Sequence, residues 1–147
     1  MCCRETVAAQ AIPADDAYRK ALALEGHFHE PGRYAYSLNQ LGVERQEGVD
    51  PLEDFVANHR TGHCEYFASA LVIMLRSQGI PARLVIGYHG GEYNPLGDYY
   101  QVVQGNAHAW VEVWLDGRWQ RFDPTAAVAP ERIEWGMDAA IDSGSLA

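Results

Sequence analysis

The first half of the chain spaces its apolar residues as helices do. Phe67, Leu71, Met74 and Leu75 recur at helical intervals, and most of the positions between them are apolar as well. A helix that is apolar nearly all round is buried in a protein core. The pattern predicts three helices and one short strand in this half: helices over 14–30, 50–59 and 64–78, and a strand over 33–38.

Capping residues indicate where these helices begin and end. Asp50 followed by Pro51 is typical of an N-cap and the first helical position. Thr61 is the candidate cap of the buried helix, which puts Cys64 in its first turn. Gly79 is expected to end that helix, because glycine readily adopts the left-handed conformation of a helix C-terminus.

After residue 81 the apolar period becomes two, which is typical of β-strands. Asp116-Gly117 is a two-residue hairpin signal, and several turn-forming residues predict a loop over 90–98. Four strands are expected, over 82–89, 99–104, 108–115 and 118–124. Helices followed by consecutive antiparallel strands indicate an α+β fold, in which the buried helix packs on an antiparallel meander.

Length and composition indicate one globular domain. With 147 residues, the chain can build one full core but is short for two domains. Its 48% hydrophobic and 21% charged residues are typical of a globular protein. We expect a flexible N-terminus over 1–13, a single domain over 14–135 and a frayed tail over 136–147.

The formal net charge of -9 argues against nucleic acid or an anionic membrane surface as a partner, since both require a basic surface. No stretch reaches the ~18 apolar residues of a membrane-spanning helix. Arg4 and Glu5 stand where a signal peptide would need its apolar region. As written, the chain is expected to be soluble and without an export signal; a domain cut from a longer protein remains an alternative.

Cys64 is the cysteine whose position suggests chemistry. The other two cysteines, Cys2 and Cys3, are adjacent, and an odd count gives no disulfide framework. In the first turn of a helix, unpaired N–H groups and the helix dipole favour a thiolate, the reactive form of cysteine. A buried structural cysteine would fit the same position equally well.

The predicted hairpin brings a histidine and a carboxylate onto one face. A two-residue turn puts Asp123 opposite Trp110 and diagonal to His108, and a four-residue loop puts Asp123 directly opposite His108. Taken singly, His108 could be a surface group and Asp123, which precedes a proline, a turn former. Taken with Cys64 they form a candidate nucleophile, base and orienting carboxylate.

Two long segments carry a family resemblance. "GHCEYFASALVIMLRSQGIPARLVIGY" and "AHAWVEVWLDGRWQRFDPTAAVAP" resemble the transglutaminase-like superfamily, in particular the periplasmic domains of multi-pass bacterial membrane proteins. The likeness spans about residues 50–133 and extends more weakly back to about residue 15. It implies a papain-like fold and a catalytic triad of Cys64, His108 and Asp123. The acidic calcium loops of animal transglutaminases are not visible, so the resemblance implies no cofactor.

Other residues are weaker candidates for the site. Beside the backbone N–H of Cys64, an oxyanion donor could come from Tyr36 or Asn39. Trp110 could form a wall of the site or belong to the core. His63, next to the nucleophile, could tune the thiol or line the cleft.

The function expected is thiol-dependent acyl transfer from protein or peptide carboxamides through a cysteine thioester, by cross-linking or deamidation. A cysteine protease or amidase on the same scaffold and a non-catalytic binding module are the alternatives. A metal site built on Cys64, His63 and His108 lacks a recognisable fourth ligand. The family suggests a cell-envelope substrate and a periplasmic location for an excised domain; otherwise the location would be cytoplasmic.

Overall fold

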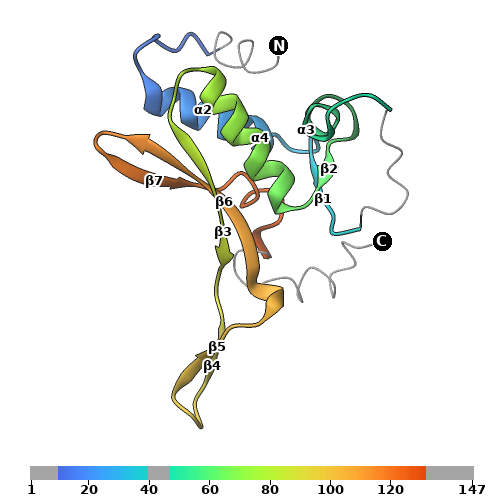
Figure 1. The fold of residues 1–147 in the computed structure, drawn as a ribbon, viewed down its shortest axis with the longest axis vertical. Coiled ribbons are helices and arrows are strands. Elements are labelled where there is room, and N and C mark those ends of the chain that lie inside the picture. The colour runs from blue at the N-terminus through green and yellow to red at the C-terminus, as the bar shows by residue number, and fades with distance from the viewer. Residues whose placement is uncertain (1–9, 40–46, 132–147) are drawn as a thin grey trace.

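The computed structural model describes residues 10–39 and 47–131, and helix α4 (Cys64–Ser77) lies at its centre. Phe67, Leu71 and Leu75 are fully buried, as their helical spacing predicted. α4 packs against the sheet strands β3 (Ala82–Tyr88) and β6 (Ala107–Leu115), and α2 (Ala17–His29) packs against α4. Figure 1 shows these two helices above the strands. The predicted buried helix on a sheet is confirmed.

The main sheet has three antiparallel strands in the order β3 (Ala82–Tyr88), β6 (Ala107–Leu115) and β7 (Arg118–Phe122). Leu115 pairs with Arg118, so the β6–β7 connection is the predicted two-residue turn. Both turn residues have positive φ, 51° at Asp116 and 76° at Gly117, which is the conformation that Asp-Gly favours. The alternate, apolar residues of β6 are buried in the core: Ala109, Val111, Val113 and Leu115.

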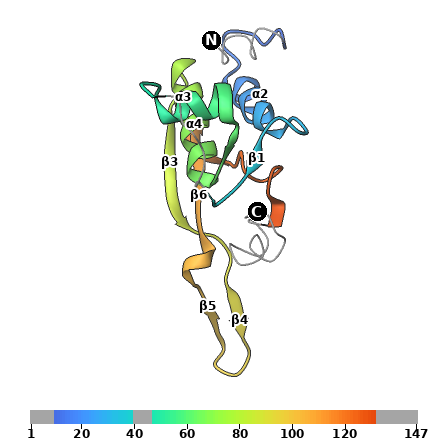
Figure 2. The same cartoon turned by 90° about the vertical axis from the view of Figure 1, so that its right-hand side faces the viewer.

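The expected order of strands is wrong at one point. β4 (Glu92–Asn94) and β5 (Tyr99–Gln101) form a separate two-stranded hairpin, and β3 pairs directly with β6. The predicted loop over 90–98 therefore contains a strand, and the strand predicted over 99–104 ends at residue 101. Figures 1 and 2 show this hairpin projecting away from the helices. The tyrosines of this hairpin are exposed, so its strands have no face buried in the core.

The N-terminal half contains a second correction. The strand predicted over 33–38 is reduced to β1 (Ala35–Tyr36), which pairs in parallel with β2 (Thr61–Gly62). Thr61 is thus a strand residue, and the N-cap of α4 is His63. Sequence gave no sign of this pairing, because two strands of two residues leave no periodic pattern.

The predicted helix over 50–59 is present in two parts. Asp50 caps α3 (Pro51–Asp54) by accepting the N–H of Leu52 at 2.8 Å, as expected. The chain continues as a π-helical turn over Phe55–His59. None of the helices in the described ranges is long and apolar enough to span a bilayer. Residues 1–9 and 136–147, which belong to the predicted terminal segments, lie outside the described residues, and the domain boundaries remain predictions.

Gly62 sets how the chain enters α4. A Cβ atom at this position would lie 3.0 Å from Cβ of Tyr66 and 3.2 Å from the ring of Phe55. Contacts this short would force the neighbouring side chains or backbone to move. The absence of a side chain at Gly62 therefore lets β2 approach α4 closely, two residues before Cys64.

The core around α4 is rich in aromatic rings, and Phe67 lies at the centre of that cluster. Its ring centroid is 5.0 Å from that of Phe55, 5.9 Å from Phe28 and 6.0 Å from Tyr34. Phe67→Ala is expected to lower the free energy of unfolding by about 3–5 kcal/mol, through lost burial and a residual cavity. Urea denaturation measures this change. Phe67→Leu should cost clearly less, and equal losses for the two variants would contradict the cavity explanation.

Candidate active site

Cys64 occupies the first position of α4, as the sequence predicted. It is a free cysteine, and only 8% of its surface is exposed. His63 precedes it as the N-cap and makes no side-chain capping bond, although its side chain contributes to lowering the pKa of the Cys64 thiol. The thiol thus lies on a buried helix, close to the unpaired backbone N–H groups of the first turn.

His108 and Asp123 form the pair expected from the hairpin. His108 Nε2 lies 2.8 Å from Asp123 Oδ2, and the His108 side chain is fully buried. The last pair between β6 and β7 joins Val111 to Phe122, so Asp123 follows directly after β7. This is the diagonal arrangement that the two-residue turn predicted. It leaves Nδ1 of His108 as the ring nitrogen available to the Cys64 thiol.

The surroundings of Cys64 favour its thiolate. Burial by itself raises the pKa of the thiol, but the neighbouring His108 and His63 side chains and the charge of His108 act in the opposite direction. The backbone N–H of Ala109 also lowers the pKa of the thiol. Together these contacts bring the pKa of Cys64 from 9.0 down to about 6. At neutral pH the group is therefore largely a thiolate.

The surroundings favour a positive charge on His108 and a negative charge on Asp123. Burial lowers the pKa of His108, but its hydrogen bond with Asp123, the neighbouring Cys64 side chain and the charges of those two groups outweigh burial and raise the pKa. Burial raises the pKa of Asp123, but the hydrogen bond and charge of His108, followed by those of Arg121, lower it. A thiolate, an imidazolium and a carboxylate in sequence can attack a carbonyl and then protonate a leaving group.

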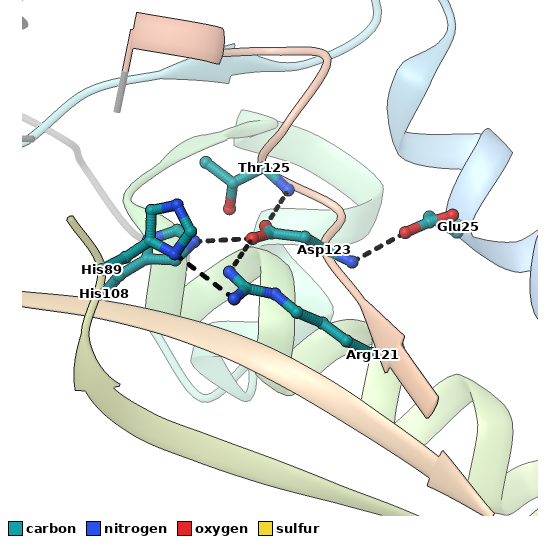
Figure 3. Close-up of polar contacts among 6 residues, drawn as sticks. All are labelled: Glu25, His89, His108, Arg121, Asp123 and Thr125. Carbon is teal, nitrogen blue, oxygen red and sulfur yellow. Dashed lines mark hydrogen bonds and ion pairs between the residues drawn. The ribbon is translucent and has the colours of Figure 1, made fainter. Parts of the chain in front are cut away.

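Asp123 is held by four neighbours (Figure 3). Its Oδ2 accepts hydrogen bonds from His108 and from Nη2 of Arg121, the latter at 3.0 Å. Its Oδ1 accepts the backbone N–H of Thr125 at 3.2 Å, and its own N–H donates to Glu25 Oε1 at 2.7 Å. The carboxylate and its backbone are therefore both fixed.

Arg121 joins this group to the aromatic residues beside it. The Trp110 ring stacks against His108, with centroids 6.2 Å apart, and the Arg121 guanidinium lies 4.5 Å from the Trp110 centroid. Nη1 of Arg121 also donates to Nδ1 of His89, at 3.3 Å. Trp110 thus lies beside His108, where a wall of the site was predicted, although its role there remains a prediction.

The remaining candidates are distributed around the site. His63 lines a cavity of about 370 Å³ together with α3 and α4 residues that include Glu65 and Ser69. Tyr36 is buried, and its ring lies 6.5 Å from that of Phe67 in the core. Asn39 is exposed, and its backbone N–H donates to Ser37. The oxyanion role of Tyr36 or Asn39 remains a prediction.

Three contributors were not foreseen from the sequence. Arg121 shares a face with Asp123 by strand alternation, and this parity was a usable signal. The Ala109 N–H became visible only when the chain placed it against Cys64. Glu25 lies 98 residues before Asp123, and nothing in its local sequence connects the two. Within residues 10–39 and 47–131, no three His, Cys, Asp or Glu side chains are grouped to hold a metal ion.

The lowered pKa of Cys64 leads to a direct prediction. Because the thiolate is the reacting form, the alkylation rate of Cys64 by iodoacetamide should rise with pH through a midpoint of about 6. The alkylation rate is measured at a series of pH values in a Cys2→Ser, Cys3→Ser background, where Cys64 is the remaining thiol. His108→Ala should move the midpoint upward. A midpoint near that of an ordinary thiol, about 8.5, would contradict the contacts described.

Comparisons with known proteins identify the family and the fold of the chain. A sequence model described as the transglutaminase-like superfamily matches residues 5–124. The crystal structure of the periplasmic domain of TgpA from Pseudomonas aeruginosa superposes with a TM-score of 0.76 and 40% identity, over 93% of this chain and 45% of that one.

Two curated proteins are similar over most of this chain. One, from Pseudomonas aeruginosa and named protein-glutamine gamma-glutamyltransferase, is 45% identical over 126 residues, which are 85% of this chain and 18% of that protein. The other, YebA of Bacillus subtilis, is 36% identical over 116 residues, which are 76% of this chain and 16% of YebA. This chain thus spans less than a fifth of either relative. It has the papain-like α+β fold and belongs to the transglutaminase-like superfamily.

Proposed function

We propose that this domain is a cysteine acyltransferase that acts on glutamine carboxamides of proteins or peptides. The observation that carries the proposal is the 2.8 Å hydrogen bond between His108 and Asp123, together with the pKa of the neighbouring Cys64 thiol, which is lowered to about 6. The name of the Pseudomonas aeruginosa relative supports this substrate class. In this proposal Cys64 is the nucleophile, His108 the acid and base, and Asp123 the group that orients His108.

The first half-reaction forms a thioester. The Cys64 thiolate attacks the side-chain carbonyl carbon of glutamine, and a C–S bond forms as the carbonyl oxygen becomes an oxyanion. The backbone N–H of Cys64, at the first position of α4, is the natural donor to that oxygen. When the C–N bond breaks, the His108 imidazolium gives its proton to the nitrogen, and ammonia leaves.

The second half-reaction resolves the thioester. Neutral His108 removes a proton from the incoming nucleophile while the lone pair of that nucleophile attacks the thioester carbonyl carbon. A primary amine gives a substituted amide and restores the thiol, which is cross-linking. Water gives a glutamate side chain, which is deamidation. Asp123 holds the His108 ring and stabilises its charged form in both halves, as its hydrogen bond to Nε2 permits.

The location of the known relative narrows the choice of substrates. The solved structure is that of a periplasmic domain, and we infer the same compartment for the present domain. Envelope proteins with exposed glutamine and lysine side chains are therefore the first substrates to examine.

The test supplies a glutamine-containing protein and a labelled primary amine, and follows label, ammonia and fragments. Label incorporated with release of ammonia supports transfer, and ammonia without label supports deamidation by the same thioester route. Cleavage fragments without either product would favour a peptidase on this scaffold. The Cys64→Ala chain is the blank. If the wild-type chain gives no label, ammonia or fragments with any of a panel of envelope proteins, the proposal is contradicted.

A further inference from the structure

Glu25 contacts the candidate site from a part of the fold remote in sequence. It lies on α2, and its Oε1 accepts the backbone N–H of Asp123 at 2.7 Å. Figure 3 shows Glu25 reaching Asp123 from the side opposite His108. Glu25 makes no hydrogen bond or ion pair with Cys64 or His108, so any effect on chemistry must pass through Asp123.

Asp123 needs this contact because of its place at the end of the sheet. Phe122 is the last β7 residue paired with β6, and β7 is an edge strand. The N–H of Asp123 therefore has no partner in the ladder, and the next residue, Pro124, has no N–H of its own. A buried N–H without an acceptor is costly, so the Glu25 carboxylate supplies what the sheet does not.

A second contact fixes α2 against the same strand end. The ring of Tyr18 lies 6.4 Å from that of Phe122, in an edge-to-face arrangement. Tyr18 and Glu25 lie about two turns apart and so on one face of α2. That face therefore contacts the two consecutive residues Phe122 and Asp123, one through an aromatic ring and one through a carboxylate.

We propose that Glu25 is a positioning residue, whose hydrogen bond to the Asp123 backbone holds the Asp123 carboxylate in register with His108. The inference rests on the proposed function, because register matters to rate only where His108 and Asp123 act on Cys64. A misplacement of about 1 Å in a catalytic group can cost about 100-fold in rate. One hydrogen bond at the strand end is thus sufficient for a measurable effect.

The electrostatic surroundings of Glu25 make its charged form less favourable than in water, so the acceptor oxygen matters more to this contact than the charge. Burial raises the pKa of Glu25, the Asp123 N–H and the charge of His29 lower it, and the charge of Asp123 raises it, with a net increase. His29 from α2 and Asp123 from the end of β7 are the ionisable groups that face it. A glutamine at this position would keep the carbonyl acceptor and remove the charge.

Three substitutions separate the position of the acceptor oxygen from the charge of Glu25. Glu25→Gln keeps an oxygen acceptor at the same distance, and its kcat should stay within about threefold of wild type. Glu25→Asp keeps the charge but shortens the side chain by one methylene group. Glu25→Ala removes the carboxylate. Both should lower kcat by about 10- to 100-fold with little change in KM, because the positioning of Asp123 is lost while substrate contacts remain.

A matched control is available on the same helix end. Glu30 forms an ion pair with Arg33 at the surface, and no recorded contact joins it to Asp123. Glu30→Gln should leave kcat unchanged. The alkylation midpoint of Cys64, in the Cys2→Ser, Cys3→Ser background, gives a readout independent of substrate. It should rise in Glu25→Asp and Glu25→Ala and stay near the wild-type value in Glu25→Gln.

The outcomes distinguish this inference from the proposed function. Equal kcat values for Glu25→Gln and Glu25→Asp would overturn the positioning role even if Glu25→Ala failed to fold, and so would an unchanged alkylation midpoint in Glu25→Asp. If the wild-type chain transfers no acyl group but the midpoint responds as described, the proposed function fails and the positioning role remains. If transfer occurs and the Glu25 variants match Glu30→Gln, the positioning role alone fails.

Discussion

Replacing Cys64 by alanine is expected to lower the acyl-transfer rate by about 10⁴-fold or more, to the level of the uncatalysed background. The reason is that no other group near His108 can form the thioester: within residues 10–39 and 47–131, Cys64 is the one free cysteine. The measurement is incorporation of labelled amine under conditions of excess substrate. The fold should survive, since the substitution removes one buried sulfur atom from a helix whose packing depends on other residues.

The chain provides a control for this result. Cys2→Ser, Cys3→Ser removes the other two thiols and should leave the rate unchanged. Thermal unfolding of Cys64→Ala should occur within a few degrees of wild type. A Cys64→Ala chain that still incorporates label well above background would contradict the assignment of the nucleophile.

Asp123→Ala is expected to lower kcat by about 10⁴-fold, the scale found when the orienting carboxylate of a catalytic triad is removed. The substitution removes the acceptor for His108 Nε2 and the charge that keeps the pKa of His108 raised. His108 would then be less charged at neutral pH, and the pKa of Cys64 would rise with it. Stopped-flow or steady-state kinetics, together with the alkylation profile of Cys64, would record both effects.

Two variants make this prediction specific. Asp123→Asn keeps an acceptor for the imidazole and loses the charge, so its rate should lie between those of wild type and Asp123→Ala. Asp116→Asn changes the other aspartate of the same hairpin, at a turn position with positive φ that asparagine tolerates, and should leave the rate unchanged. Equal rates for wild type and Asp123→Ala would show that His108 does not depend on this carboxylate.

Much of the candidate site could be predicted from local sequence because its geometry is local. His108 lies on β6 and Asp123 directly follows β7, the strand joined to β6 by a two-residue turn, so the side-chain period of two determines which face each occupies. Cys64 begins a long apolar helix, so the periodic pattern alone placed it near the helix N-terminus. The same argument could have identified Arg121, because it lies on β7, two residues before Asp123.

The errors arose where local pattern contains no information on pairing. The turn-forming residues around Tyr93 predicted a loop, and the strand pattern that begins at Tyr99 does not tell a strand of the main sheet from a hairpin exposed to solvent. Thr61 fits an N-cap by residue type, yet its pairing with Ala35 makes it part of β2. Both cases depend on which segments meet in space.

The sequence by itself therefore determined the buried helix, the hairpin and the alignment of His108 with Asp123, because each follows from spacing along one or two adjacent elements. Only the tertiary structure decided that α4 delivers Cys64 to His108, that the Ala109 N–H faces the sulfur, and that Glu25 holds the backbone of Asp123. These contacts join segments up to 98 residues apart. They depend on how helices pack on the sheet, and packing of distant segments leaves no periodic trace in the chain.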